Sequence, residues 1–333
     1  MLKKLLRQNE TYVLLLILLI GAVIGLKNPL FFSFENISGF LKSYSMLGIM
    51  SVGTLFVLVL GGTDVSFTAI AQVVEYAVVV LTLKFGGNIY VAFAEAAALG
   101  IILGFFNGFI IHKFKVPIII VTIATSNIYF GLLYVLTKGK LINNIPQMFK
   151  DFGNVLLFPQ TSAIGGTYGL SLMPIIWIAA LILGWFILKK TMAGRQVFAV
   201  GGNETAAERV GIATLWTKLF VFGFVGFLAG IAAIVHVAIV QSVVPNIIMG
   251  KEMEVIAAVV IGGASIFGGK GTIIGTFLGV LLFAMLNNGL TLLRISSYWY
   301  SVTTGAIILI AIVVSAYQKR HREKTHVKVQ IQE

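Results

Sequence analysis

Residues 193–212 read AGRQVFAVGGNETAAERVGI, a polar island between two long apolar stretches. The island predicts a short helix, because Asn203 is a good N-cap, Glu204 suits a first turn and Gly211 is a natural stop. Its small apolar face consists of Ala206, Ala207 and Val210. A small capped helix held between membrane spans is suited to docking on a soluble partner. The same residues also suit an ordinary solvated loop.

The composition around this island is that of an integral membrane protein. Hydrophobic residues make up 58% of the chain and charged residues 11%, far from the balance of a soluble protein. The chain has no cysteine, which excludes disulfides and thiolate chemistry. Its net charge of +12 comes from basic residues at the ends and between apolar runs. That distribution indicates membrane orientation and not nucleic-acid binding.

About ten apolar stretches approach the roughly 20 residues that a helix needs to cross a bilayer. The eighth stretch is short and ends in glycines, so we expect a broken or half-length helix there. The predicted fold is therefore an all-α, polytopic transmembrane bundle. The predicted spans are 10–26, 44–60, 66–83, 89–111, 117–136, 172–188, 215–241, 252–266, 272–293 and 298–317.

The distribution of Lys and Arg predicts how these spans are oriented. With a cytoplasmic N-terminus, sixteen basic residues fall in inside segments and eight in outside segments. Both termini and the 189–214 loop are then cytoplasmic. The longest loop, 138–171, is outside, where it either covers a pore mouth or simply connects spans. Residues 1–317 form one membrane domain, whose first span is a retained anchor, and 318–333 form a hydrophilic cytoplasmic tail.

A second motif, GGTDVS, occupies residues 61–66 between two apolar runs. An ionised Asp64 facing lipid is costly, so we expect it to face water, protein or a helix end. Gly61 and Gly62 let the backbone break, while Ser66 can cap the next helix and Asp64 can accept its free N–H groups. We favour this structural role over direct contact with a substrate, which stays the alternative.

Several polar residues lie within predicted spans. Gln72 and Glu75 share one helix face and can line an aqueous path together with Asn107. Alternatively, Glu75 forms a hydrogen bond inside the bundle. His236 is expected to be a satisfied interior residue and not a proton relay. Asn287 and Asn288 add either interhelical hydrogen bonds or polarity along a pore.

A third motif, GGASIFGGKGT, occupies residues 262–272. It is not a phosphate-binding loop, because a glycine follows the lysine where that loop needs Ser or Thr. Its glycines allow tight packing and a sharp re-entry into the membrane. Gly262 and Gly263 end an apolar run, as Gly61 and Gly62 do, and interrupted helices in both halves of a transporter often mark the substrate path. Close packing is also expected at Gly100, Gly104, Gly275 and Gly279.

Three segments, 61–66, 193–212 and 262–276, resemble in the same order the signature segments of ABC-transporter permeases that import simple sugars. The resemblance implies a permease for a monosaccharide of the ribose, xylose or galactose type. Thr63 and Phe67 depart from the family pattern, which leaves the substrate open. The implied ATPase-coupling residues are Gly194, Arg195, Gly202, Asn203, Glu204, Ala206, Ala207 and Gly211. The expected helix-break and translocation-path residues are Gly61, Gly62, Asp64, Ser66, Gln72, Glu75, Asn107, Gly262 and Gly263.

The resemblance also implies partners in a bacterial inner or plasma membrane. A separate ATPase with two nucleotide-binding modules would use the ATP, an extracytoplasmic binding protein would deliver the sugar, and a second permease subunit would complete the pathway. The chain itself is expected to need no cofactor and no metal. Alternatives within the family are importers of a furanosyl autoinducer, a nucleoside or a branched-chain amino acid.

Two other classes of protein stay in view. An ion-coupled secondary transporter would use Asp64, Glu75 or His236 as proton carriers. A membrane-embedded enzyme is disfavoured, because the sequence has no nucleophile elbow, no H-E-x-x-H motif and no cluster of metal ligands.

Overall fold

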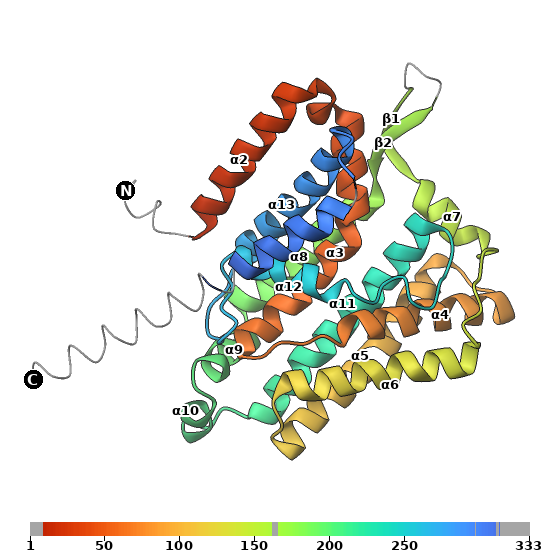
Figure 1. Ribbon diagram of the computed structural model, residues 1–333. Coiled ribbons are helices and arrows are strands. Elements are labelled where there is room, and N and C mark those ends of the chain that lie inside the picture. Colours follow the sequence, from red (N-terminus) through yellow and green to blue (C-terminus); the bar gives the residue numbers. More distant parts are fainter. Residues whose placement is uncertain (1–8, 162–165, 297, 311–312, 314–333) are drawn as a thin grey trace, which may run out of the picture.

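The computed structural model describes residues 9–161, 166–296, 298–310 and 313. This part of the chain is almost entirely helical, which confirms the predicted all-α class (Figure 1). Eight of its helices are long and apolar enough to cross a membrane. These are α2 (Asn9–Lys27), α3 (Phe34–Leu60), α4 (Phe67–Phe85), α5 (Ile89–Phe114), α6 (Ile118–Thr137), α8 (Leu172–Lys190), α11 (Thr214–Val240) and α13 (Ile273–Leu292).

Shorter helices fill the intervals between these eight. The predicted eighth span is the ten-residue helix α12, which ends just before Gly262 and Gly263, as expected. The described part of the predicted tenth span is an apolar helix, Tyr298–Ile310. The predicted tail, 318–333, lies outside the described residues. The remaining short elements are η1 (Pro29–Phe32), α7 (Gln147–Asn154), α9 (Met192–Gly202), α10 (Glu204–Arg209) and α12 (Glu252–Ile261).

Helix α3 forms the centre of the bundle, and every residue from 44 to 60 in it is buried. It begins ten residues before the predicted span. The hydroxyl of Ser33 accepts a hydrogen bond from the backbone N–H of Asn36 at 3.2 Å and so caps the helix. The ammonium of Lys42 is accommodated by donating to the carbonyl of Gly153 in α7 at 2.8 Å. The predicted span omitted this first part because its polar residues lower the hydropathy. In the folded chain these polar residues have tertiary partners.

Glycine faces bring two helix pairs into close contact, as predicted. A Cβ at Gly104 of α5 would lie 2.1 Å from the carbonyl oxygen of Phe222 in α11. A Cβ at Gly279 of α13 would lie 1.9 Å from that of Ala258 in α12. Both separations are far shorter than a van der Waals contact, so only glycine permits these crossings.

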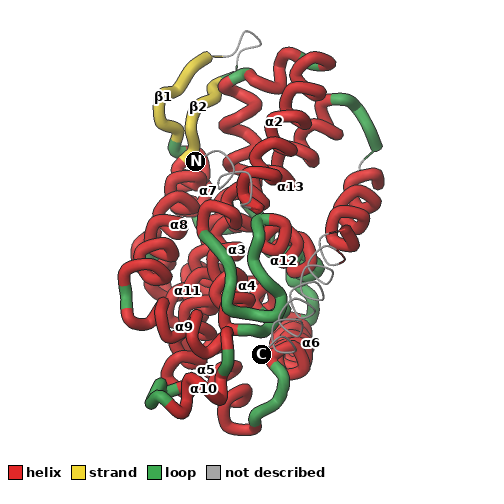
Figure 2. Tube along the Cα trace, turned by 90° about the vertical axis from the view of Figure 1, so that its left-hand side faces the viewer, coloured by secondary structure: helices red, strands yellow, loops and turns green. Residues whose placement is uncertain are grey.

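The 138–171 segment is more ordered than the predicted connecting loop. It contains α7 and an antiparallel hairpin of β1 (Leu156–Thr161) and β2 (Thr167–Ser171). The pairing shifts between Leu157 and Gln160, where Pro159 cannot donate to a ladder. Because of this proline, the strand was not predicted from the sequence. The hairpin and α10 lie at opposite ends of the bundle in both views (Figures 1 and 2).

Candidate functional site

The three sequence motifs meet at one end of the bundle. Gly61 ends α3 with a left-handed φ of 95°. A Cβ at Gly201, in the last turn of α9, would lie 1.7 Å from the carbonyl oxygen of Val59. A Cβ at Gly268 would lie 2.3 Å from the carbonyl oxygen of Gly201, and the N–H of Gly269 donates to Val59 at 2.9 Å. Segments distant in sequence thus pack backbone against backbone.

The predicted helix of the first motif is confirmed as α10. The Asn203 side chain accepts from the N–H of Ala206 at 2.9 Å. Gly211 turns the chain with a φ of 84°, and its N–H donates to Glu208 at 3.0 Å. Sequence reasoning missed the preceding helix α9. The sequence feature that could have predicted α9 is its N-cap, Thr191, whose hydroxyl accepts a hydrogen bond from the N–H of Gly194 at 3.2 Å.

The predicted apolar face of α10 needs correction. Ala207 is buried against the bundle, whereas Ala206 is exposed and Val210 is 77% exposed. Ala207 therefore points into the bundle, away from the exposed Ala206 and Val210. Trp216, at the start of α11, is 70% exposed at the same end of the molecule. Arg195, Gly202, Asn203, Glu204 and Gly211 are exposed as well, whereas Gly194 is buried.

Two side-chain contacts attach α10 to the beginning of α11. The carboxylate of Glu204 lies 2.5 Å from the ammonium of Lys218, whose side chain is only 9% exposed. The hydroxyl of Thr214 donates to Glu208 at 3.0 Å. A nearly buried lysine needs its charge partner, so Glu204 ties the exposed helix to a 27-residue span.

The Asp64 side chain is part of a buried network. Its Oδ1 accepts from both the N–H and the hydroxyl of Ser66, at 2.7 and 2.6 Å. The amide of Asn107 donates to the Ser66 hydroxyl at 2.7 Å, and Tyr129 donates to Asn107 at 3.2 Å. The network joins the turn between α3 and α4 to α5 and α6. These partners favour the structural role for Asp64.

The predicted cap on α4 is wrong in detail. Ser66 occupies the N-cap position, but its backbone is already helical and its hydroxyl makes no capping bond. The hydroxyl hydrogen-bonds to Asp64 and Asn107 instead.

The second oxygen of Asp64, Oδ2, has no partner within the described residues. Burial raises the pKa of Asp64 to about 6, and the two bonds from Ser66 oppose that shift.

Gln72 and Glu75 are fully buried and engaged in packing. Oε2 of Glu75 lies 2.8 Å from Nδ1 of His236 in α11. Oε1 of Gln72 accepts from the N–H of Ile248 at 2.9 Å. The structure therefore contains the hydrogen bond inside the bundle that was one of two alternatives for Glu75. Nδ1 of His236 has a partner inside the bundle, as expected, but the ring is 11% exposed and lines a cavity.

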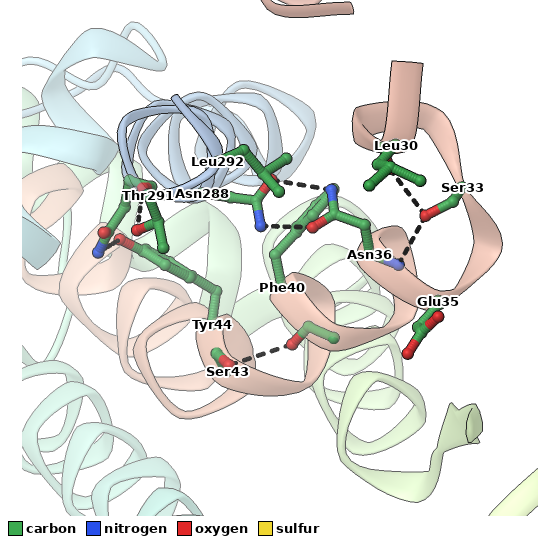
Figure 3. A pocket seen from close by; sticks show the side chains of 12 residues that line it. Leu30, Ser33, Glu35, Asn36, Phe40, Ser43, Tyr44, Asn288, Thr291 and Leu292 are labelled. Carbon is green, nitrogen blue, oxygen red and sulfur yellow. Dashed lines mark hydrogen bonds between the residues drawn. The ribbon is translucent and has the colours of Figure 1, made fainter. Parts of the chain in front are cut away.

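Two adjoining cavities are lined by residues other than those predicted for the translocation path. The outer cavity, about 620 Å³, lies between α3 and α13 (Figure 3). Asn36 and Asn288 exchange amide hydrogen bonds across it at 2.9 and 2.7 Å. Near its rim, Phe34 of α3 contacts Tyr168 of the hairpin, with ring centroids 6.2 Å apart. The outer cavity therefore lies at the hairpin end of the bundle, away from α10.

The inner cavity, about 310 Å³, lies deeper between α3, α11, α12 and α13. The amide of Asn287 donates to the Tyr44 hydroxyl at 2.9 Å, and that hydroxyl lies 3.1 Å from the hydroxyl of Tyr300. Tyr300 in turn donates to Glu254. Both cavities share Ser43, Tyr44 and Asn287. Together they form a polar groove, whose inner part is also lined by His236, Lys251 and Glu254.

Sequence reasoning missed most of this groove. It noted Asn287 and Asn288, but not Tyr44 or Glu254. A tyrosine or glutamate at the edge of an apolar run carries no sign of which partner it meets. The pairing arises only when α3, α12 and α13 pack together.

Comparison with known proteins agrees with the motifs. Residues 36–312 match a family described as the permease component of branched-chain amino acid transport systems. The chain belongs to this permease family. It is a multi-pass membrane protein and a transporter component. No solved structure matches it.

The permease is similar over most of its length to import permeases with named substrates. The ribose import permease of Haemophilus influenzae is 34% identical over 93% of both chains. That of Escherichia coli K12 is 33% identical over 93% of this chain and 94% of its own. The autoinducer 2 import permease of Yersinia pseudotuberculosis is 31% identical over 93% of this chain and 85% of its own.

Proposed function

We propose that this permease imports a ribose-like monosaccharide as the membrane subunit of an ATP-driven importer. The observation that carries the proposal is the similarity to ribose import permeases at 33–34% identity over 93% of the chain. The motifs that resemble sugar permeases also pack together at one end of the bundle, around Gly61, Gly201 and Gly268.

The two ends of the bundle suit two different partners. At one end, Val210 just after α10 and Trp216 at the start of α11 are exposed, which suits docking on an ATPase with two nucleotide-binding modules. At the other end, the hairpin borders the mouth of the groove, which suits delivery by an extracytoplasmic binding protein. Both termini are then cytoplasmic, in agreement with the distribution of basic residues.

The polar groove supports a second permease subunit. Asn36 and Asn288 lie on helices long and apolar enough to cross the membrane, and polar groups there are unfavourable against lipid. A second permease facing the groove would replace lipid with protein and water. The two subunits would then enclose one pathway.

Transport in this arrangement is alternating access. Closure of the ATPase on ATP displaces α10, and the Glu204–Lys218 pair transfers that displacement to α11. ATP shifts the equilibrium only by the difference between the contacts that the ATPase makes in the two states. The loaded binding protein biases the opposite end in the same way.

The autoinducer 2 permease relative supports a second candidate substrate, a furanosyl signal molecule. The two candidates are separated by uptake into vesicles that contain the permease, its ATPase and its binding protein. We expect unlabelled ribose, but neither the furanosyl signal nor leucine, to compete with labelled ribose. Competition by the furanosyl signal at lower concentration than ribose would favour the second candidate instead.

A further inference from the structure

The inner cavity brings together hydrogen-bonding groups from helices that are far apart in sequence. Tyr44 comes from α3, His236 from α11, Glu254 from α12 and Asn287 from α13. Tyr44 lies ten residues, about 15 Å, along α3 from its outer end, whereas Val240 is the last residue of α11 and Lys251 immediately precedes α12. The rest of the lining is mainly apolar and comprises Met46, Leu47, Ile239, Val240 and Ile247.

One ring nitrogen of His236 can form a hydrogen bond with a ligand in this cavity. Its Nδ1 is held by the buried carboxylate of Glu75 at 2.8 Å. Within the described part of the chain, Nε2 makes no hydrogen bond. The bond at Nδ1 fixes the ring, and Nε2 then serves as a donor or an acceptor according to the protonation state. A hydroxyl group can bond to Nε2 in either state, because a hydroxyl both donates and accepts.

The charges around the cavity do not select a charged ligand. Lys251 and Glu254 carry opposite charges, and their ammonium and carboxylate lie 3.9 Å apart. Glu254 also accepts from Tyr300. The remaining polar groups are the hydroxyls of Ser43 and Tyr44, the Asn287 amide and the His236 ring. Such a lining, with polar groups among apolar ones, suits a neutral molecule with several hydroxyls and an apolar ring face.

We propose that the inner cavity is a binding station for a neutral polyol, in which Tyr44, His236 and Asn287 hydrogen-bond the hydroxyls of the molecule in transit. The inference rests on the proposed sugar import and adds a site within the membrane to it. Glu75 is the positioning residue, since it holds His236 without lining the cavity. The volume, about 310 Å³, is at the lower end of the roughly 300–1,000 Å³ typical of small-molecule sites, as expected for a small sugar.

The test uses the complete importer in proteoliposomes with labelled ribose. Tyr44→Phe removes one hydroxyl and keeps the ring, and His236→Asn removes Nε2 while its amide keeps an N–H donor for Glu75. We expect ribose imported per ATP hydrolysed to fall roughly fivefold in each variant, the equivalent of one hydrogen bond of about 1 kcal/mol. Stimulation of ATP hydrolysis by the loaded binding protein should stay unchanged. Tyr90→Phe, at an exposed tyrosine, is the matched control.

A panel of ribose analogues that each lack one hydroxyl separates binding from a structural effect. If Tyr44 contacts a hydroxyl, the analogue lacking it is imported equally by the wild type and by Tyr44→Phe. The same loss for every analogue, or normal ribose import by Tyr44→Phe, would overturn the site while leaving sugar import intact. If the wild-type importer takes up no sugar, the proposed function itself fails.

Discussion

Asp64 shows how a single residue can look functional in a sequence and structural in three dimensions. A carboxylate between two apolar runs suggested either a substrate contact or a helix end. The folded chain surrounds it with Ser66, and Asn107 and Tyr129 continue the network. Burial disfavours the charged form of Asp64 and raises its pKa to about 6, and both hydrogen bonds from Ser66 reach a single oxygen, which an amide also provides.

We therefore expect Asp64→Asn to assemble normally and to keep most of the transport rate, because the amide oxygen can still accept from Ser66. Asp64→Leu leaves buried donors unpaired, at a cost of about 1–3 kcal/mol each, and should lower the amount of assembled permease. Thermal unfolding in detergent and uptake measure both effects, with Asp151→Asn at an exposed position as the control. A normally assembled Asp64→Asn protein without transport would show that the charge itself is needed.

Gly201 and Gly202 offer a matched pair of substitutions. A Cβ at Gly201 would lie 1.7 Å from a backbone oxygen of α3, whereas a Cβ at Gly202 meets nothing within 4 Å. Gly201→Ala must therefore separate α9 from α3, and we expect it to lower the melting temperature clearly. Gly202→Ala should melt within a degree or two of the wild type. Equal melting temperatures would show that the motifs are not packed this closely.

At the scale of elements, the proposed coupling runs through α10. It is a short helix with an exposed surface, and its Glu204 forms an ion pair with the nearly buried Lys218 of α11. α11 packs against α3, α4 and α5 and also carries His236 of the inner cavity. A displacement of α10 can therefore reach the cavity through one continuous helix.

This link predicts the outcome of a charge exchange. Glu204→Lys places two positive charges together, with one of them nearly buried, and should lower transport at least tenfold. The exchange Glu204→Lys with Lys218→Glu restores the opposite charges and should recover much of the loss. Uptake and ATP hydrolysis measured together show whether coupling is affected. If the double variant is no better than the singles, the pair does not transmit the movement.

The helix caps explain how much of the elements the sequence revealed. α10 was predictable because Asn203 and Gly211 act locally, within four residues of their partners. α12 was predictable from the glycines that end it. The hairpin was not, because Pro159 sits in a bulge, and neither was the first part of α3, where Lys42 depends on α7. The groove was missed for the same reason, since its partners are set by tertiary packing.

At the scale of the whole molecule, the bundle has two distinct ends, and a groove with polar groups opens at one of them. The hairpin and the groove mouth lie at one end, and α10 with the three packed motifs lies at the other (Figures 1 and 2). This polarity is what an importer needs, because substrate delivery and energy supply act on opposite sides of the membrane.

The most direct test of this account is ribose uptake into proteoliposomes from which one component at a time is withheld. The account predicts uptake only when the permease, the ATPase, ATP and the binding protein are all present, and no effect of collapsing the proton gradient. Uptake by the permease alone, lost when the proton gradient is collapsed, would contradict it and identify an ion-coupled transporter.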